Sequence, residues 1–263
     1  MGIVVRTHTE KFSESPKDTT ATEPHHVVCS FLPRISIIED LTKEPIPAGT
    51  NILVEYDPGS HWYAASHTIA AGWLKSGGER VSITAIAQPP ETIRLQLKKL
   101  GLDCEELEKA DRLRIHDYYT ATLGLKSTER FGYSSLKAAE VSIDFVKTQL
   151  TGPPIPEVLR IVDSASPMSR FNEEKSWVEF LLTRGLPVAR LTKSSLIGGM
   201  IRGIHSDWVY KQLEDANDAI IDMKLDESGE EPKNLIRIRS MRNIGFDARW
   251  HLLKMTENQV TLE

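Results

Sequence analysis

The turn from Tyr56 to Tyr63 is the part of the sequence whose residue types and position best fit a chemical site. It follows a compact apolar run, Asn51 to Tyr56 (NILVEY), which predicts a buried strand. Where a strand of a parallel sheet turns into a helix, backbone N–H groups and the helix dipole converge, so nucleotide phosphates bind at such turns. The position of this turn therefore predicts a phosphate site, and its residues decide whether that site can work.

A working phosphate loop has the spacing GxxxxGK[ST]. Its glycines let the backbone approach the phosphates, its lysine cancels their charge, and its hydroxyl holds magnesium. The turn instead reads Tyr56, Asp57, Pro58, Gly59, Ser60, His61, Trp62 and Tyr63. A charged hydrogen bond to phosphate contributes on the order of 1.5 to 3 kcal/mol, and an indole cannot supply it. An aromatic side chain buries roughly 150 to 250 Å², so Trp62 and Tyr63 could occupy the space of the phosphates.

A second candidate, Asp163, ends a later apolar run, Val158 to Val162, which predicts another strand. Its carboxylate could hold magnesium, as an acidic residue does beside many phosphate loops. An acid in this place could also cap the turn that follows the strand. Both interpretations stay open from the residues, and the missing lysine favours the cap.

A third set of candidates is basic and lies near the C-terminus. It comprises Arg237, Arg239, Arg242 and Arg249. These side chains could bind nucleic acid, or they could form the solvated face of edge strands. A formal net charge of -5 and a lack of interleaved aromatic residues make nucleic acid the less favoured partner.

Two stretches contain histidine. His61 and His67 are six residues apart, so they do not share a helix face as i, i+4 metal ligands would, and no metal site is predicted. His205, Ser206 and Asp207 have the residue types of a hydrolase triad, but such a triad is assembled in space and not in sequence. Ser206 is instead predicted to cap a helix.

Apolar runs that alternate with amphipathic stretches must position these residues. Strands are predicted at Asn51–Tyr56, Arg80–Ile86, Leu113–Ile115, Val158–Val162 and Leu196–Ile201. Helices are predicted at Trp62–Lys75, Ile93–Leu100, Leu136–Leu150, around Trp177 and Leu181 up to a stop near Gly185, and after Ser206. Ala219–Leu225 and Leu235–Met241 predict an antiparallel hairpin, and Trp250–Met255 predicts a further strand. The fold class is α/β, with a parallel sheet first and an antiparallel edge last.

Composition bounds the kind of protein. The chain has 263 residues and 40% hydrophobic content, enough for a large buried core. No apolar run approaches the roughly 20 residues that span a bilayer, and the N-terminus has no apolar core of a signal peptide. The cysteines, Cys29 and Cys104, form no CxxC pair, which fits a reducing, cytoplasmic location. We expect a flexible tail over residues 1–26 and one domain over residues 27–263.

Several segments, in this order along the chain, resemble KaiC-type domains of the RecA superfamily. The opening stretch is IPAGTNILVEYDPGSHWYAASHTIAAGWLKSGGERVSIT, where the family has a similar strand before a GPPGSGKT loop. The later stretches are PPETIRLQLKKLGLD, VLRIVDSAS and IRIRSMRNIGFDARWHLLKMTENQV. Together they cover roughly Pro33 to Val260. The resemblance implies a three-layer RecA-like fold: a mostly parallel central sheet, helices on both faces and C-terminal antiparallel edge strands.

Carried across residue by residue, the resemblance implies a remnant nucleotide site. Its members are Pro58, Gly59, Ser60, His61, Trp62, Tyr63, Asp163 and Arg242. Within the loop, the family's first glycine corresponds to Tyr56 and its second to His61. The phosphate lysine corresponds to Trp62 and the magnesium hydroxyl to Tyr63, so only Pro58, Gly59 and Ser60 are retained.

Two other parts of the family's mechanism are also changed. Its adjacent catalytic glutamates, which follow the second strand, correspond to Ala87 and Gln88, and neither side chain is a carboxylate. In its trans-acting lysine and arginine pair, Ser240 takes the lysine position, whereas Arg242 matches the arginine. Transition-state charge on a transferring phosphoryl group is normally met by the lysine, magnesium and a positioned base.

These replacements predict a catalytically degenerate ATPase-fold protein that acts as a non-hydrolysing regulatory or assembly module. Its expected partner is another copy of itself or a different protein, and neither a catalytic residue nor a resident cofactor is predicted. The alternative is a nucleotide-binding protein or ATPase with an unorthodox phosphate loop. That alternative would use ATP and magnesium with Asp163, Arg242 and backbone N–H groups near Gly59 and Ser60.

Overall fold

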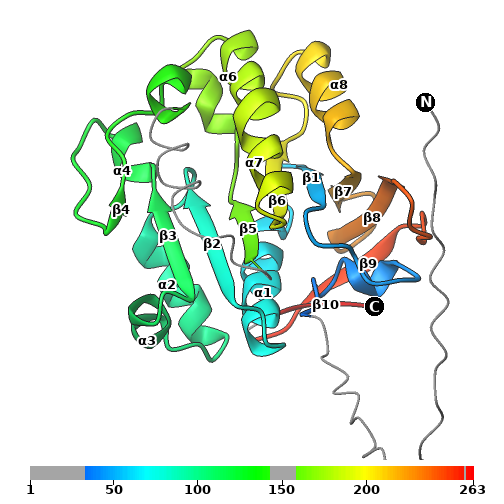
Figure 1. Ribbon diagram of the computed structural model, residues 1–263. Coiled ribbons are helices and arrows are strands. Elements are labelled where there is room, and N and C mark those ends of the chain that lie inside the picture. The colour runs from blue at the N-terminus through cyan, green and yellow to red at the C-terminus, as the bar shows by residue number, and fades with distance from the viewer. Residues whose placement is uncertain (1–32, 143–157, 258) are drawn as a thin grey trace, which may run out of the picture. The chain divides into compact units, whose positions relative to one another are not determined.

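The computed structural model of the chain describes residues 33–142, 158–257 and 259–263 (Figure 1). The tail predicted over residues 1–26 lies outside them, so this prediction and that of one domain over 27–263 stay predictions. Part of the helix predicted over Leu136–Leu150 also lies outside the described residues, while residues 138–142 are helical.

The described residues form one sheet with the strand order β10-β9-β8-β7-β1-β6-β5-β2-β3-β4. Its strands are β1 (Asn51–Tyr56), β2 (Arg80–Ala85), β3 (Leu113–Asp117), β4 (Phe131–Gly132), β5 (Val158–Val162), β6 (Ser195–Ile201), β7 (Ala219–Asp226), β8 (Lys233–Met241), β9 (His251–Met255) and β10 (Val260–Leu262). All neighbours from β7 to β4 in this order pair in parallel, whereas β8, β9 and β10 add on antiparallel. This confirms the predicted parallel sheet with an antiparallel C-terminal edge.

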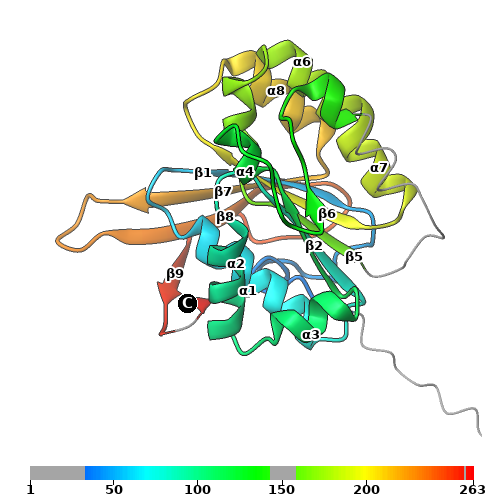
Figure 2. The ribbon, with the colours of Figure 1, turned by 90° about the vertical axis from the view of Figure 1, so that its left-hand side faces the viewer.

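Helices cover both faces of the sheet (Figure 2). One face carries α1 (Trp62–Lys75), α2 (Pro90–Lys99) and α3 (Cys104–Lys109), and the other carries α6 (Glu174–Phe180), α7 (Leu186–Leu191) and α8 (Asp207–Ala216). A short helix, α4 (Tyr119–Thr122), follows β3. The three layers confirm the predicted fold class.

The period of two along β1 explains why there are two cores. Ile52 and Val54 point to the face that α1 covers and pack in its core. Leu53, between them, packs with Trp177 of α6 and Val209 of α8 in the core on the other face. Strands buried on both faces are apolar throughout, as the run NILVEY predicts.

The predicted stop near Gly185 is wrong. The chain passes from α6 through a π-helical turn, η3 (Leu181–Gly185), directly into α7. Gly185 is buried within this continuous segment. Pro187, which has no N–H to give to a helical hydrogen bond, lies in the first turn of α7, where that loss is tolerated.

Ser206 lies at the predicted N-cap position of α8 but does not make the predicted capping hydrogen bond. Ser206 is the N-cap residue, yet its side chain makes no capping hydrogen bond. Its hydroxyl instead donates to Glu174 Oε2 (2.6 Å) at the start of α6. The carboxylate of Glu174, in the first turn of α6, thus takes the hydroxyl that would otherwise cap α8.

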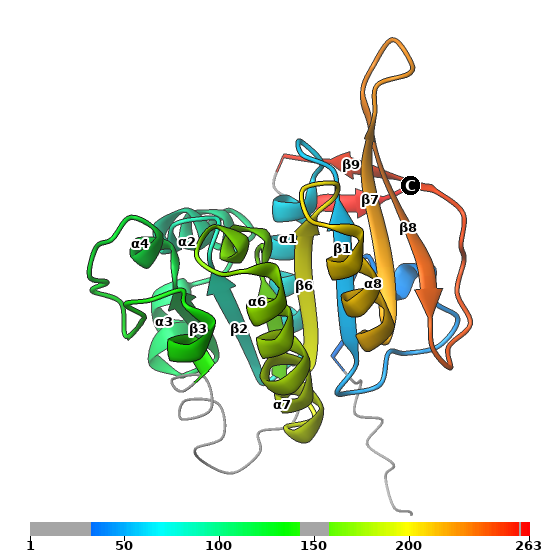
Figure 3. The ribbon, with the colours of Figure 1, turned by 90° about the horizontal axis from the view of Figure 1, so that it is seen from above.

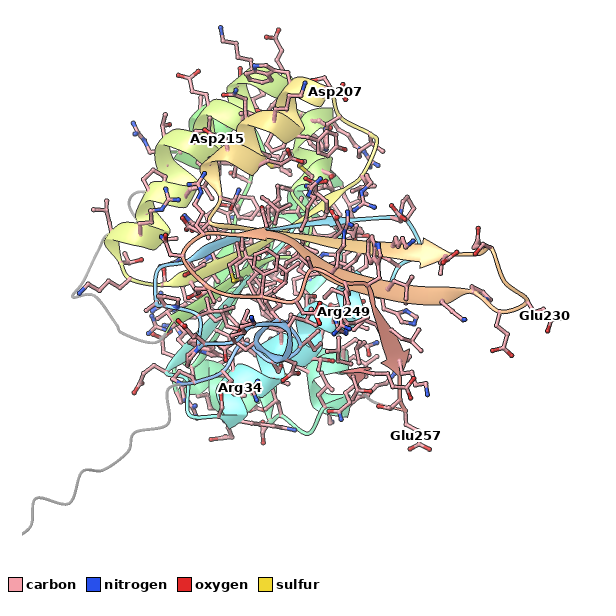
Figure 4. All side chains as sticks on the ribbon, turned by 90° about the vertical axis from the view of Figure 1, so that its right-hand side faces the viewer. Arg34, Asp207, Asp215, Glu230, Arg249 and Glu257 are labelled. Atoms are coloured by element: carbon pink, nitrogen blue, oxygen red, sulfur yellow. The ribbon has the colours of Figure 1, made fainter. Side chains whose placement is uncertain are left out.

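The hairpin of β7 and β8 extends beyond the parallel strands (Figure 3). Its turn carries Glu227, Glu230 and Glu231, and Glu230 lies at its tip (Figure 4). Among the described residues, the search for a helix long and apolar enough to cross a membrane finds none.

Candidate functional site

The turn from Asp57 to His61 connects β1 to α1 at the carboxyl edge of the parallel strands. Asp163 and Ser164 follow β5 at the same edge. β6 lies between β1 and β5 in the sheet, and its Gly199 approaches both the turn and Asp163. The structure therefore brings the predicted loop residues and Asp163 together.

Trp62 fills the space beneath this turn. Its side chain is only 1% exposed, and its indole Nε1–H donates to the main-chain oxygen of Asp163 (2.6 Å). Its ring stacks on Tyr56, with ring centroids 5.9 Å apart. A Cβ on Gly199 would lie 2.2 Å from Trp62 Nε1, so a glycine in β6 is required for the indole to fit.

Tyr63 joins a short chain of hydroxyl groups beside the indole. Its Oη lies 3.1 Å from Tyr56 Oη, and Tyr56 Oη donates to Ser164 Oγ (2.9 Å). Burial raises the pKa of both tyrosines above the ordinary value, so they are neutral donors and acceptors at physiological pH. The hydroxyl that stands at the magnesium position is thus engaged with other side chains.

Both carboxylate oxygens of Asp163 accept hydrogen bonds from the backbone. Oδ1 accepts from Ile86 N (2.9 Å) and Ser164 N (2.6 Å), and Oδ2 accepts from Ala87 N and Gln88 N (both 2.9 Å). Burial raises the pKa of Asp163 to about 6, while these N–H donors act in the opposite direction. The contacts fix the loop between β2 and α2 to the end of β5.

The backbone of the turn is tied to neighbouring strands. His61 N donates to Asn234 Oδ1 of β8 (2.8 Å), and Ser60 N donates to Asp57 O (3.1 Å). Gly59 has φ +82, a conformation that side chains other than glycine rarely adopt. At least two N–H groups of the turn are therefore already bound within the chain.

A network of ion pairs, which the sequence did not predict, holds Asp57 of the turn. Arg202, just after β6, pairs with Asp57 (3.1 Å) and with the buried Asp222 of β7 (2.9 Å). Arg237 also pairs with Asp222 (2.8 Å). A buried acid in the middle of an apolar strand, as in AIIDMKL, is the signal that could have indicated a partner.

The two arginines of β8, Arg237 and Arg239, lie within this network of ion pairs and not on an open basic stripe. Arg239 pairs with Glu55 and Glu214, both at 2.7 Å. Burial raises the pKa of Glu55 to about 7, against the influence of the Arg239 charge. Arg249 is exposed and pairs with Asp247 (2.6 Å). All of these arginines have acidic partners within the chain.

Arg242 lies at the opposite edge of the sheet from the turn. Its backbone N donates to Asp218 O (2.8 Å), and the N of Asp218 donates to Asn51 O at the start of β1 (2.8 Å). Its guanidinium is 52% exposed and donates to the main-chain oxygen of Asp215 on α8. Figure 4 labels Asp215. Within one chain, Arg242 is therefore not part of the site.

Ser166, His205 and Glu174 lie in line. They are not the consecutive residues His205, Ser206 and Asp207 that were considered from the sequence. His205 Nε2 lies 3.1 Å from Ser166 Oγ, and His205 Nδ1 lies 3.5 Å from Glu174 Oε1. Ser166 is only 2% exposed, and its Oγ accepts a hydrogen bond from Ile201 N (2.9 Å). These contacts join the segments after β5 and β6, and the serine hydroxyl is buried.

The comparisons with known proteins address the fold that carries this site. The sequence matches the family model described as the KaiC ATPase over residues 34–263. A solved structure with a similar fold is a KaiC-like protein from the hyperthermophilic archaeon Pyrococcus horikoshii, with a TM-score of 0.62 and 19% identity; it covers 88% of this chain and 97% of that chain. A search of curated proteins finds no match. The resemblance seen in the sequence is confirmed, and the chain belongs to the KaiC ATPase family of the RecA superfamily.

Proposed function

We propose that this chain keeps the KaiC fold as a scaffold for protein assembly and does not hydrolyse ATP. One observation carries the proposal: the Trp62 indole fills the space beneath the turn and is bonded to Asp163 O at 2.6 Å. A phosphate loop uses the position of Trp62 for a lysine that reaches the β- and γ-phosphates. An indole offers one neutral donor, and here that donor already has an acceptor.

ATP with magnesium is the ligand that the family implies, and the residues present do not fit it. The Tyr63 hydroxyl contacts Tyr56, and both oxygens of Asp163 accept backbone N–H groups. A magnesium ion would have to displace these buried contacts, which is costly because the N–H groups would lose their acceptors. Within the described ranges, no group of three or more His, Cys, Asp or Glu residues could hold a metal ion.

The loop where the family places its catalytic glutamates offers no base either. Ala87 and Gln88 both donate their backbone N–H to Asp163, and neither side chain is a carboxylate. A base must be able to accept a proton from the attacking water in hydrolysis. The missing lysine, the engaged Asp163 and the missing base support the same proposal independently.

The surface at the carboxyl edge supports the assembly part of the proposal. Three large apolar side chains that follow β5 or β6 in the chain are exposed: Ile204 (55%) in the loop after β6, Trp208 (44%) in the first turn of α8, and Phe171 (39%) in the segment between β5 and α6. Glu174 accepts hydrogen bonds from the N and Oγ of Ser206, which holds the two loops together. Exposed aromatic and aliphatic residues grouped beside a rigid framework are typical of protein-binding surfaces.

The first experiment measures phosphate release from ATP and magnesium by the full chain. The proposal predicts a rate no higher than that of buffer. Turnover that is lost in the Asp163→Asn variant would contradict the proposal and favour an ATPase with an unorthodox loop.

The second experiment measures mass by light scattering after size exclusion. We expect a species larger than the 29.6 kDa chain, and we expect Trp208→Asp and Ile204→Asp to reduce it to a monomer. Leu191→Asp is the matched control, since Leu191 is 72% exposed at the C-terminal end of α7. A monomer over a wide concentration range would remove self-assembly from the proposal and leave a different protein as the partner.

A further inference from the structure

Two buried carboxyl groups lie side by side on the face of the sheet that α8 covers. Glu55 of β1 follows Leu53 by two residues, so it shares that face. Glu55 is in register with Asp222 of β7, and the two residues are 3% and 2% exposed. Two like charges in neighbouring positions away from water oppose each other, so keeping both ionised is costly unless each has its own cation.

The ion pairs around these two acids contain one carboxylate more than they contain cations. Within the described ranges, the groups that these ion pairs link are three guanidiniums and four carboxylates: Arg202, Arg237, Arg239, Glu55, Asp57, Glu214 and Asp222. One acid of this set therefore lacks a matching positive charge when all of them are ionised.

Other side chains on the elements around Glu55 do not supply that charge. The other charged residues of α8 are exposed: Asp207, Lys211 and Asp215. Lys224 of β7 lies over the Trp250 ring, with its Nζ 4.7 Å from the ring centroid. β6, on the other side of β1, places the uncharged Met200 beside Glu55.

Three of the four acids have partners or water to stabilise their charge. Asp222 accepts hydrogen bonds from two arginines, Arg202 (2.9 Å) and Arg237 (2.8 Å). The side chains of Asp57 and Glu214 are 31% and 32% exposed, so water can stabilise their charges. These three acids therefore need no proton.

Glu55 is the acid with the least compensation. Its ion pair is with Arg239 Nη2 (2.7 Å), and the same nitrogen also donates to Glu214 (2.7 Å). Burial raises the pKa of Glu55 to about 7; the Arg239 charge opposes this rise, and the hydrogen bond and charge of Glu214 add to it. Both the contacts and the burial thus favour the neutral form of this carboxyl group.

We propose that Glu55 carries a proton near neutral pH and that this proton joins β1 to α8. The neutral carboxyl group donates its O–H to Glu214, while Arg239 donates to both acids. On ionisation the O–H bond breaks, the electron pair stays on the Glu55 oxygen, and the proton passes to water. Two carboxylates then share one guanidinium nitrogen, and the partly exposed Glu214 moves toward solvent.

The stabilisation by this proton is present at acidic pH and absent at alkaline pH. A pKa that is raised in the fold means that the closed state binds the proton more tightly than an open state with Glu55 in water. The hold on α8 is therefore lost as pH rises through about 7. This device does not depend on the function proposed above.

The first test follows the side-chain carboxyl carbon of Glu55 in the ¹³C-labelled full chain as pH is varied. The resonance is assigned from its absence in Glu55→Gln. We expect a midpoint near pH 7, against about 4.3 for an ordinary glutamate. In Glu214→Gln the midpoint should shift to lower pH because a neighbouring negative charge is removed. Asp215→Asn, an exposed acid on the same helix, should leave it unchanged.

The second test measures hydrogen exchange of the α8 amide groups at pH 6 and pH 8, corrected for the intrinsic exchange rate. Protection of α8 should fall about threefold to tenfold between these values in the unmodified chain, as the loss of one net hydrogen bond would give. Glu55→Gln has an amide that stays neutral and can still donate, so its protection should be the same at both values.

Three outcomes would overturn the proposal. A Glu55 midpoint below about pH 5.5 would overturn the assignment of the proton. Equal protection of α8 at pH 6 and pH 8 in the unmodified chain, or a fall that persists in Glu55→Gln, would overturn the link to α8. If Glu55→Gln does not fold, the glutamate resonance with the highest midpoint is followed in Glu214→Gln, and no acidic shift there would overturn the proposal.

Discussion

Two tryptophans on opposite faces of the sheet are equally buried but differ in their hydrogen bonding. Trp62 and Trp177 are 1% and 0% exposed, so both are core residues by burial. The Trp62 indole N–H has its acceptor, Asp163 O, and the ring lies against Tyr56 and Gly199. No described residue accepts the Trp177 N–H, and the ring borders a cavity of about 90 Å³.

The two tryptophans differ in whether the indole N–H has an acceptor within the described residues. At the turn after β1, the Trp62 indole N–H and both carboxylate oxygens of Asp163 have hydrogen-bond partners within the chain. Beneath α6, the Trp177 indole N–H has no acceptor among the described residues, and a cavity of about 90 Å³ lies nearby.

The largest expected effect on stability comes from removing the buried side chain of Trp62. Trp62→Ala should lower the free energy of unfolding by about 3 to 5 kcal/mol, because it removes a buried aromatic side chain and leaves a cavity. Chemical denaturation monitored by circular dichroism measures this. Trp208→Ala is the matched control, since that side chain is 44% exposed, and it should change stability by less than about 1 kcal/mol. Equal effects for the two variants would contradict the account of Trp62.

The next largest effect on stability is expected at Asp163, whose carboxylate binds the backbone of the loop before α2. In Asp163→Asn, one carboxylate oxygen becomes an NH₂ group that cannot accept the backbone N–H groups of the loop before α2. Each buried N–H left without an acceptor should cost about 1 to 3 kcal/mol. Thermal unfolding measures the loss against Asp215→Asn, whose side chain is 92% exposed. A stable Asp163→Asn chain would show that Asp163 is free for another role.

A smaller effect is the loss of stability at acidic pH that a buried histidine on each face of the sheet should cause. Burial lowers the pKa of His116, beside the cavity, to about 3, and that of His67, in α1, to about 4. Both values lie below the ordinary 6.5, so the unfolded chain binds the proton first and stability is lost as pH falls below 6.5.

The slope of that loss can be measured by comparing variants. Each histidine should contribute a decrease of about 1.4 kcal/mol per pH unit between pH 6.5 and its folded-state pKa. Urea unfolding from pH 7 to pH 4.5 should therefore show a shallower acid loss in His116→Gln than in the unmodified chain, and similarly in His67→Gln. An unchanged pH dependence in His116→Gln would mean that the pKa of this imidazole is the same in the folded and the unfolded chain.

The smallest effect is expected at Arg242. Its side chain is 52% exposed and donates to a main-chain oxygen on α8, so Arg242→Ala should change the free energy of unfolding by less than about 0.5 kcal/mol. Denaturant midpoints measure this, and Arg202→Ala gives the contrast, since Arg202 pairs with the buried Asp222. A loss from Arg242→Ala as large as that from Arg202→Ala would place Arg242 in the structural core.

The sequence predicted the fold and the position of the turn because both depend on local patterns. The run NILVEY, the glycine in the turn and the hairpin signals each act over a few residues. The contacts of Asp163 with residues 86–88 could not be predicted, since β5 and β2 become neighbours only after the sheet forms. The predicted stop at Gly185 was wrong because packing on α6 and α7 overrides the weak helix propensity of glycine.

The ion pairs and the cavity were missed for a related reason. Arg202 and Asp222 are 20 residues apart and meet across β1, which pairs with both of their strands. The cavity has walls from several strands and from the turn η3, whose π-helical form has no periodicity signal. Periodicity shows which face of an element is buried, but not how completely the space beneath it is filled.

The most direct test of the central claim is calorimetric titration of the full, unmodified chain with ATP and magnesium. If Trp62 and Tyr63 occupy the phosphate space and the oxygens of Asp163 are already bound, the titration should show no saturable heat. The matching measurement of unfolding temperature should show no rise with ATP, since a ligand that binds only the folded state must stabilise it. Saturable binding that Asp163→Asn abolishes would contradict this account and identify the turn as a working nucleotide site.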